Sequence, residues 1–247
     1  MSGHSKWASI KHRKSANDAK RGKLFTKIIK EIMVSARLGG GDPESNARLR
    51  TALLKAKSAN MPKDNIERAI KKGTGEAGDV EYHEIVYEAY APGGVALLID
   101  VLTDNRNRTA AEIRNILSKG GGNLGELGCV SYLFKRKGVI TFDASKYSED
   151  EIMAVALEAG AEDLVAENGT LEVITQPEDF EKVLNALEDD GLENTYSEIT
   201  MLADNSVMLD IEKAQKVLNL IENLEDNDDV QNVSSNLDIP QDLVDKA

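Results

Sequence analysis

The order of helix and strand patterns between residues 138 and 202 is the feature that most limits the fold. Periodicity and turn residues predict strand 138–142, helix 148–159, strand 162–167, strand 170–175, helix 178–189 and strand 194–202. Asn168-Gly169, between the two middle strands, is a strong signal for a tight hairpin. A βαββαβ order is typical of the ferredoxin-like arrangement, a complete two-layer domain. We therefore expect such a domain over residues 137–205.

The first part of the chain predicts a small all-helical module. Between about Ala16 and Leu38 the apolar residues recur at steps of three and four, as in an amphipathic helix that ends at Gly39-Gly40-Gly41. Asp42-Pro43-Glu44 has the composition of a helix start, with Asp42 as the cap. A third helix is expected to open at Pro62 and to stop near Gly73.

The segments that remain predict a middle domain. Tyr82–Ala91 and Val95–Leu102 have the composition of two paired strands, followed by helix 106–119 and a further strand over Val130–Lys135. A helix at about 210–224 and a strand at 229–234 are too little for a domain, so we assign them to this middle sheet. The expected fold class is α+β with three domains: a basic helical domain (1–78), an α/β domain (79–136 plus 206–247) and the ferredoxin-like domain inserted into it (137–205).

Charge is distributed very unevenly along the 247 residues. The whole chain has 30 Lys and Arg against 43 Asp and Glu, a formal net charge of −13. Residues 1–75 hold 18 of the bases and 6 of the acids, net +12, which leaves 12 bases and 37 acids, net −25, for the remainder. A basic part of this kind favours contact with a polyanion, while the acidic part favours solubility. The first prediction of function is therefore nucleic-acid binding.

The cationic head supplies most of the candidate contacts. On the first helix the lysines lie opposite the apolar stripe, and such a stripe is either a solvated helix face or a phosphate-binding surface. Trp7 could stack on a base or plug the core of the helical module. The candidate residues are Lys6, Trp7, Lys11, His12, Arg13, Lys14, Lys20, Arg21, Lys23, Lys27 and Lys30.

A second group of candidates follows the middle hairpin. Arg106 and Arg108 stand at the start of a helix, where the helix dipole disfavours cations. They either pair with acids of their own domain or contact the phosphates or carbonyls of another macromolecule. Asn123, in the glycine-rich loop 120–125, is a further secondary contact; this loop lacks the Lys-Ser/Thr of a phosphate loop.

Signatures of catalysis and metal binding are missing from the sequence. There is no nucleophile elbow, no phosphate-loop motif and no zinc-type spacing among His4, His12 and His83, while Cys129 is the single cysteine. We expect no enzyme activity, no metal and no cofactor. No apolar run approaches the roughly 20 residues of a membrane span, so we expect a cytoplasmic protein.

Several ungapped motifs are spread over essentially the whole chain. They are Gly3-His4-Ser5-Lys6-Trp7-Ala8, Asp18-Ala19-Lys20-Arg21-Gly22-Lys23, Gly40-Gly41-Asp42-Pro43, Asn60-Met61-Pro62, Asp64-Asn65-Ile66, Pro92-Gly93-Gly94-Val95-Ala96, the run 102–109 and Gly121-Gly122-Asn123-Leu124-Gly125. Together and in this order they resemble the YebC/PmpR family. Cys129 and Ala203 depart from the family pattern, the latter replacing a proline of a Met-x-Pro motif.

The resemblance implies three domains and a non-enzymatic regulator. Members are described as DNA-binding transcriptional regulators or as ribosome-associated translation factors, mitochondrial translational activators among them. The partner is therefore expected to be DNA or ribosomal RNA, through the transcription machinery or the ribosome. The residues leave open two rival classes, an RNA- or nucleotide-directed enzyme and a pure protein-interaction scaffold, and they do not give the oligomeric state.

Overall fold

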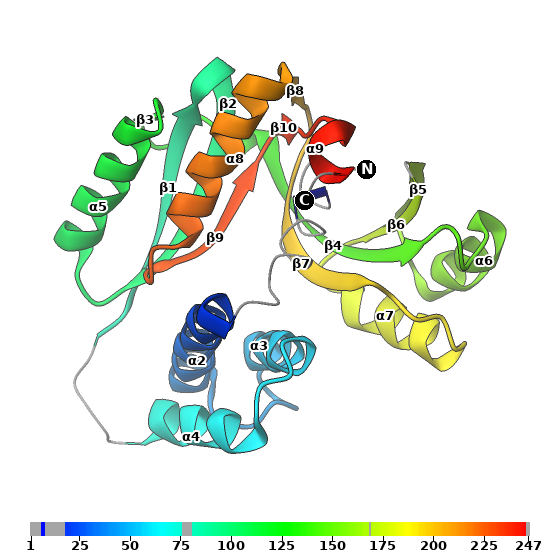
Figure 1. Cartoon of the computed structure of the whole chain (residues 1–247). Coiled ribbons are helices and arrows are strands. Elements are labelled where there is room, and N and C mark those ends of the chain that lie inside the picture. Colours follow the sequence, from blue (N-terminus) through cyan, green and yellow to red (C-terminus); the bar gives the residue numbers. More distant parts are fainter. Residues whose placement is uncertain (1–5, 8–17, 76–80, 168, 246–247) are drawn as a thin grey trace. The chain divides into compact units, whose positions relative to one another are not determined.

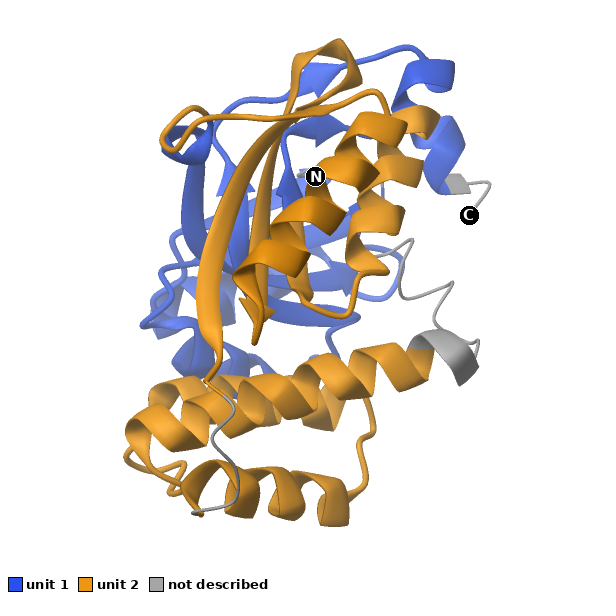
Figure 2. Ribbon diagram, turned by 90° about the vertical axis from the view of Figure 1, so that its left-hand side faces the viewer, with its two compact units in different colours: residues 1–13, 130–214, 234–247 blue, residues 14–129, 215–233 orange. Residues whose placement is uncertain are grey.

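The structure is a computed structural model that describes residues 6–7, 18–75, 81–167 and 169–245, with side chains on the first long helix from residue 21. Its elements form two compact units, coloured separately in Figure 2. Unit 1 holds residues 1–13, 130–214 and 234–247, and unit 2 holds residues 14–129 and 215–233. The predicted α+β class is confirmed, with helices first and the sheets after them (Figure 1); two of the sheets have four strands each, and β8 and β10 form a two-stranded one. The three domain boundaries stay a prediction.

Three helices form the first part of unit 2. Their shared core is apolar and includes Ile32 and Leu49, neither of which is exposed to solvent. Gly73 lets the third helix approach the first closely, since a Cβ there would lie 2.5 Å from the carbonyl oxygen of Met33. The helices are α2 (Asp18–Gly39), α3 (Ala47–Ser58) and α4 (Lys63–Thr74).

The predicted start of α3 was wrong. Asn46, not Asp42, caps the helix, and its side-chain oxygen accepts a hydrogen bond from the backbone N–H of Leu49. The side-chain amide of Asn46 also donates to the carbonyls of Ser35 and Gly40, so one buried residue ties α3 to the end of α2. Asp42 instead begins a short turn before the helix, where its side chain accepts from the N–H of Glu44.

Arg48 adds a polar link from α3 to α2 and to the first strand. Its guanidinium makes a two-nitrogen contact with Glu31, with Nε and Nη2 at 2.7 and 3.0 Å from the carboxylate oxygens. Nη1 lies 2.6 Å from Glu84. The hydrogen bond to Glu31, with further help from Glu84, raises the pKa of Arg48 above its ordinary value despite partial burial.

The middle sheet has the strand order β3-β1-β2-β9. Strands β1 and β2 pair antiparallel, from His83 opposite Thr103 to Ala91 opposite Val95. Helices α5 and α8 lie side by side (Figures 1 and 2), and a Cβ at Gly120 would lie 2.6 Å from the Leu220 side chain. The elements are β1 (His83–Ala91), η1 (Pro92–Gly94), β2 (Val95–Thr103), α5 (Arg106–Lys119), β3 (Asn123–Leu124), α8 (Ile211–Glu225) and β9 (Val230–Ser235).

The separate strand predicted over Val130–Lys135 was wrong. Residues 131–133 form a short 3-10 helix, η2 (Ser131–Leu133), and β4 begins at Phe134. Strand β4 then runs without a break to Asp143 and belongs to the second sheet, because Phe134 already pairs with Ala203. The apolar run around residue 134 therefore lengthens the ferredoxin-like sheet, and β3 and β9 complete the middle one.

The second sheet confirms the predicted βαββαβ order. All its neighbouring strands are antiparallel, in the order β5-β6-β4-β7 of the ferredoxin-like arrangement. Gly169 has φ +78°, as the predicted tight hairpin requires. Its elements are β4 (Phe134–Asp143), α6 (Glu149–Ala159), β5 (Asp163–Glu167), β6 (Thr170–Thr175), α7 (Phe180–Asp189) and β7 (Tyr196–Ala203); β8 (Val207–Met208), β10 (Leu237–Asp238) and α9 (Gln241–Asp245) follow.

Candidate nucleic-acid interface

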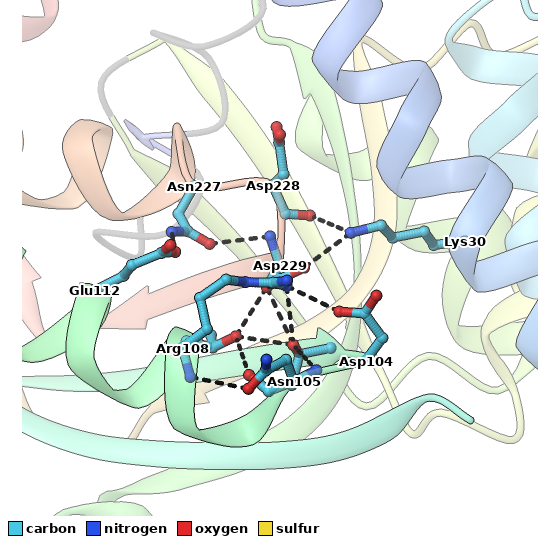
Figure 3. Close-up of polar contacts among 10 residues, drawn as sticks. Lys30, Asp104, Asn105, Arg108, Glu112, Asn227, Asp228 and Asp229 are labelled. Carbon is cyan, nitrogen blue, oxygen red and sulfur yellow. Dashed lines mark hydrogen bonds and ion pairs between the residues drawn. The ribbon is translucent and has the colours of Figure 1, made fainter. Parts of the chain in front are cut away.

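The lysine stripe of α2, formed by Lys23, Lys27 and Lys30, is occupied within unit 2. It contacts the acidic turn, residues 225–229, which leads from α8 into β9. Lys23 Nζ lies 3.2 Å from Asp226 Oδ1, and Lys27 Nζ donates to the carbonyl of Glu225. Lys30 Nζ donates to the carbonyl of Asp228 at 2.9 Å and to Asp229 Oδ1 at 3.0 Å (Figure 3). The stripe is therefore neither a bare solvated face nor an open phosphate site in this structure.

Asp229 is the centre of this contact. The residue is 5% exposed, and its carboxylate accepts from Arg108 Nη2 at 2.6 Å and Thr109 Oγ1 at 2.8 Å, besides Lys30. Thr103 Oγ1 donates to it at 3.1 Å. Burial alone would raise the pKa of Asp229, but the hydrogen bonds from Arg108, Lys30 and Thr109 outweigh burial and lower it to about 2. Asp229 is therefore ionised at neutral pH.

Hydrogen bonds to the backbone position Arg108 and Asp229 on either side of this contact. Asn105 caps α5 by accepting from the N–H of Arg108, which places the arginine in the first turn. On the other side, Asn227 Oδ1 accepts from the N–H of Asp229, and Asn227 Nδ2 donates to Glu112 on α5 (Figure 3). The ion pair with Asp229 explains why α5 has an arginine where its dipole disfavours one.

A cavity of about 570 Å³ lies beside this cluster in unit 2. Its charged lining has five acidic side chains against three bases, so it attracts cations more than phosphates. The acids are Asp104, Glu112, Asp226, Asp228 and Asp229, and the bases are Lys23, Lys30 and Arg108.

The other candidate residues lie elsewhere or are not described. Arg106 Nη2 lies 3.0 Å from His83 Nδ1, and Asn123 is exposed on β3. Lys6 and Trp7 are each 5% exposed, and Lys6 Nζ contacts Asp238 Oδ1 at 2.8 Å within unit 1. Both side chains are therefore too buried to contact a partner in this structure.

Outside the described residues lie the candidates Lys11, His12, Arg13 and Lys14 and the side chain of Lys20. Arg21 is exposed, with its guanidinium above the ring of Phe25.

Exposed bases on α3 and α4 form a further group, which the sequence-based prediction of contact residues did not include. Within the described part of the chain, the side chains of Lys57, Lys71 and Lys72 make no hydrogen bond or ion pair. Helical spacing already places Lys71 and Lys72 away from the buried Ala69 and Gly73, so periodicity could have found them. We call the exposed bases on these two helices the α3–α4 basic face: Lys55, Lys57, Lys63, Arg68, Lys71 and Lys72.

Comparison with known proteins places this chain in a family. A profile described as the TACO1/YebC protein N-terminal domain matches residues 5–76, and one described as the TACO1/YebC second and third domain matches residues 82–237. The chain belongs to the TACO1/YebC family.

The TACO1/YebC relatives match over nearly their whole length. A protein of Treponema denticola is 61% identical, covering 98% of each chain, and one of Syntrophus aciditrophicus is 59% identical, covering 100% of this chain and 99% of the relative. Both are named probable transcriptional regulatory protein. The crystal structure of a conserved hypothetical protein from Aquifex aeolicus has a TM-score of 0.79 at 51% identity and covers 90% of this chain and 92% of its own.

Two further properties bear on the chemistry of this TACO1/YebC protein. Across the described residues, no three His, Cys, Asp or Glu side chains gather where they could hold a metal ion. Among the described helices none has the length and apolarity needed to cross a bilayer.

Proposed function

We propose that this protein is a cytoplasmic, non-enzymatic regulator that binds nucleic acid, with duplex DNA as its partner in transcription. The α3–α4 basic face would contact the phosphates, and the acidic remainder of the chain would limit indiscriminate binding. The names of the relatives support the regulatory role. The observation that carries the proposal is that Lys57, Lys71 and Lys72 have no acidic partner among the described residues.

A structural explanation of the same lysines also exists, and it must be tested. Lysines in the last turn of a helix stabilise the helix dipole by about 0.3–1 kcal/mol each without any ligand. All three occur near a helix C-terminus, in α3 or α4. Only a phosphate contact, however, would make the affinity for nucleic acid depend on them.

Ribosomal RNA is a second candidate partner, favoured by the start of α4. Sequence-specific reading of DNA requires free polar groups at the start of a recognition helix. Here Asn65 Oδ1 is occupied by Arg68 Nη2, and the same guanidinium contacts the carbonyl of Asp64. The helix start therefore has few free groups for base edges, which suits a sequence-independent contact with the sugar-phosphate backbone of a folded RNA.

The test is the salt dependence of binding, measured by fluorescence anisotropy with a labelled DNA duplex and a ribosomal RNA fragment. Each phosphate neutralised contributes a slope of about −0.9 in log affinity against log salt on duplex DNA. The triple variant Lys57→Gln/Lys71→Gln/Lys72→Gln should flatten the slope by about 2.7 if all three lysines contact phosphates. The matched control is Lys119→Gln/Lys146→Gln/Lys182→Gln, which changes the net charge equally at three other exposed lysines.

The outcome separates the proposals. A salt dependence that becomes less steep in the α3–α4 variant but not in the control supports phosphate contact by this face. Tighter binding of the duplex favours the DNA role, and tighter binding of the RNA favours the ribosomal one. Failure of the wild-type chain to bind either polymer in dilute buffer would refute nucleic-acid binding altogether.

A further inference from the structure

The lysine stripe of α2 and the acidic turn both lie within unit 2. Several features of their contact would allow another polyanion to displace the acidic turn from the lysines. From this contact we infer that Lys23, Lys27 and Lys30 form a second polyanion-binding surface, which the acidic turn covers in the unbound protein. Nucleic acid and the acidic turn would then compete for the same three ammonium groups. This inference rests on the proposed nucleic-acid binding and adds a masked surface to it.

The spacing of the stripe suits a phosphate chain. Lys23 and Lys30 are seven residues apart on one helix, which at 1.5 Å per residue separates them by about 10 Å along its axis. Successive phosphates of one DNA strand advance about 3.4 Å along the duplex axis, so the stripe is about three phosphates long. The acidic turn meets the stripe with carbonyl and carboxylate oxygens.

The acceptors of the acidic turn resemble phosphate oxygens in chemistry. The stripe contacts the carbonyls of Glu225, Asp226 and Asp228 and the carboxylates of Asp226 and Asp229. Lysine binds such oxygens as a point charge and does not need the fixed geometry of a guanidinium contact. Phosphate oxygens can therefore replace these acceptors if the lysine side chains only reorient.

The contact is weakest at its outer end. The side chains of Lys23 and Asp226 are 45% and 50% exposed, whereas those of Lys30 and Asp229 are 17% and 7% exposed. An ion pair as exposed as the first one contributes little to stability because water screens it. The outer pair is therefore the one that a polyanion in solution can reach most easily.

The inner end can also separate without leaving a buried charge alone. If Lys30 moves away, Asp229 still accepts from Arg108, Thr103 and Thr109. These three donors stand in β2 and α5, so they stay with Asp229 whatever α2 does. The severe penalty of an unpaired buried carboxylate is thereby avoided.

The helical core does not depend on the stripe. Ile28, Ile32 and Met33 on the other side of α2 pack against Leu49 and Ala52 of α3. The three lysines therefore add no apolar contact within this cluster, and α2 can keep its fold when they change partners.

Two variants test the inference by the same anisotropy measurement. Lys23→Gln/Lys27→Gln/Lys30→Gln should flatten the salt slope on duplex DNA by about 2.7, whereas the control triple variant at residues 119, 146 and 182 should not. Asp226→Asn, which weakens the cover without touching α2, should tighten binding by up to about fivefold. Its control, Glu126→Gln, removes one charge from an exposed loop of the same unit and should tighten binding less.

The results distinguish this inference from the proposed function. Wild-type binding that depends on residues 57, 71 and 72 but not on the stripe leaves the proposed function standing and overturns the masked surface. Equal affinities of Asp226→Asn and Glu126→Gln also overturn the competition, even if the stripe variant fails to fold. Absence of wild-type binding refutes the proposed function itself.

Discussion

Replacement of Asp229 by asparagine should loosen the cluster that joins α5 to β9. The amide has nearly the same size but no charge, and its Nδ2 donates where the carboxylate accepts. Arg108 Nη2 at 2.6 Å and Thr109 Oγ1 at 2.8 Å share Oδ2, whereas Lys30 Nζ lies 3.0 Å from Oδ1. The single oxygen of the amide can keep only one of these two sets of donors and, without a charge, binds it more weakly. Because Asp229 is only 5% exposed, water cannot fully replace the lost contacts.

The magnitude follows from the pKa of Asp229. A pKa of about 2 in the folded protein, against an ordinary value of 3.8, corresponds to about 2 kcal/mol of stabilisation of the charged form. Since the folded pKa is the lower one, this stabilisation is complete above about pH 5 and is lost as the pH falls towards 2. Asp229→Asn should therefore reduce the free energy of local opening by about 2 kcal/mol at pH 7, and by roughly half of that at pH 3.

Amide hydrogen exchange read by mass spectrometry measures this effect without assuming that the whole chain unfolds in one step. Peptides of α5 and β9 should exchange about 30-fold faster in Asp229→Asn at pH 7, whereas peptides of α6 and α7 in unit 1 should not change. Asp228→Asn is the control, since the Asp228 side chain is exposed and Lys30 binds only its backbone carbonyl. Equal exchange in the two variants, or a difference that does not shrink at pH 3, would refute the reasoning.

Three further predictions concern α2, α3 and α4, and the same exchange measurement on their peptides checks each. Gly73→Ala should speed opening because its Cβ would lie 2.5 Å from a backbone oxygen of α2, whereas Gly22→Ala, with nothing within 4 Å, should stabilise α2 by up to about 1 kcal/mol. Asn46→Ala should lower the free energy of opening by about 1–2 kcal/mol, and Asp42→Ala by much less. Arg48→Lys should lower it by about 1 kcal/mol because the two-nitrogen contact with Glu31 of α2 is lost. No change would show that water screens this partly exposed pair.

The ferredoxin-like part of the chain could be predicted because its information is local. Apolar periodicity gives each element, and Gly and Asn residues mark where one ends. Strands β5 and β6 therefore start or end within one residue of the prediction. The error at Val130–Lys135 has a physical reason, because a short apolar run fits a new strand and an extension of β4 equally well.

Competing caps explain the error at α3. Asp and Asn side chains are both favoured as caps at a helix start, so composition alone does not choose between Asp42 and Asn46. The choice depends on the amide of Asn46, which also donates to the carbonyls of Ser35 and Gly40 at the end of α2. A carboxylate has no such donor, and the sequence does not show which carbonyls lie nearby.

The candidate site was less predictable, since its decisive contacts join distant residues. Periodicity shows that Lys23, Lys27 and Lys30 lie opposite the core stripe of α2, but it cannot show what covers them. Their acceptors lie about two hundred residues later in the sequence, in the acidic turn. Arg108 is a similar case: the alternative that it pairs with an acid of its own domain was open, but nothing in the sequence selects Asp229.

The charge separation along the chain therefore has two different consequences in space. Where the bases of α2 meet the acidic turn, opposite charges from the two parts cancel within one unit, and a polyanion must displace an internal acceptor before it binds. Where the bases of α3 and α4 are exposed, no such step is needed. If both surfaces bind the same polymer, affinity should rise in two stages as the salt concentration is lowered, because only the lysine stripe must first lose the acidic turn. Asp226→Asn weakens the contact between the turn and the stripe, so in this variant the two stages should become one.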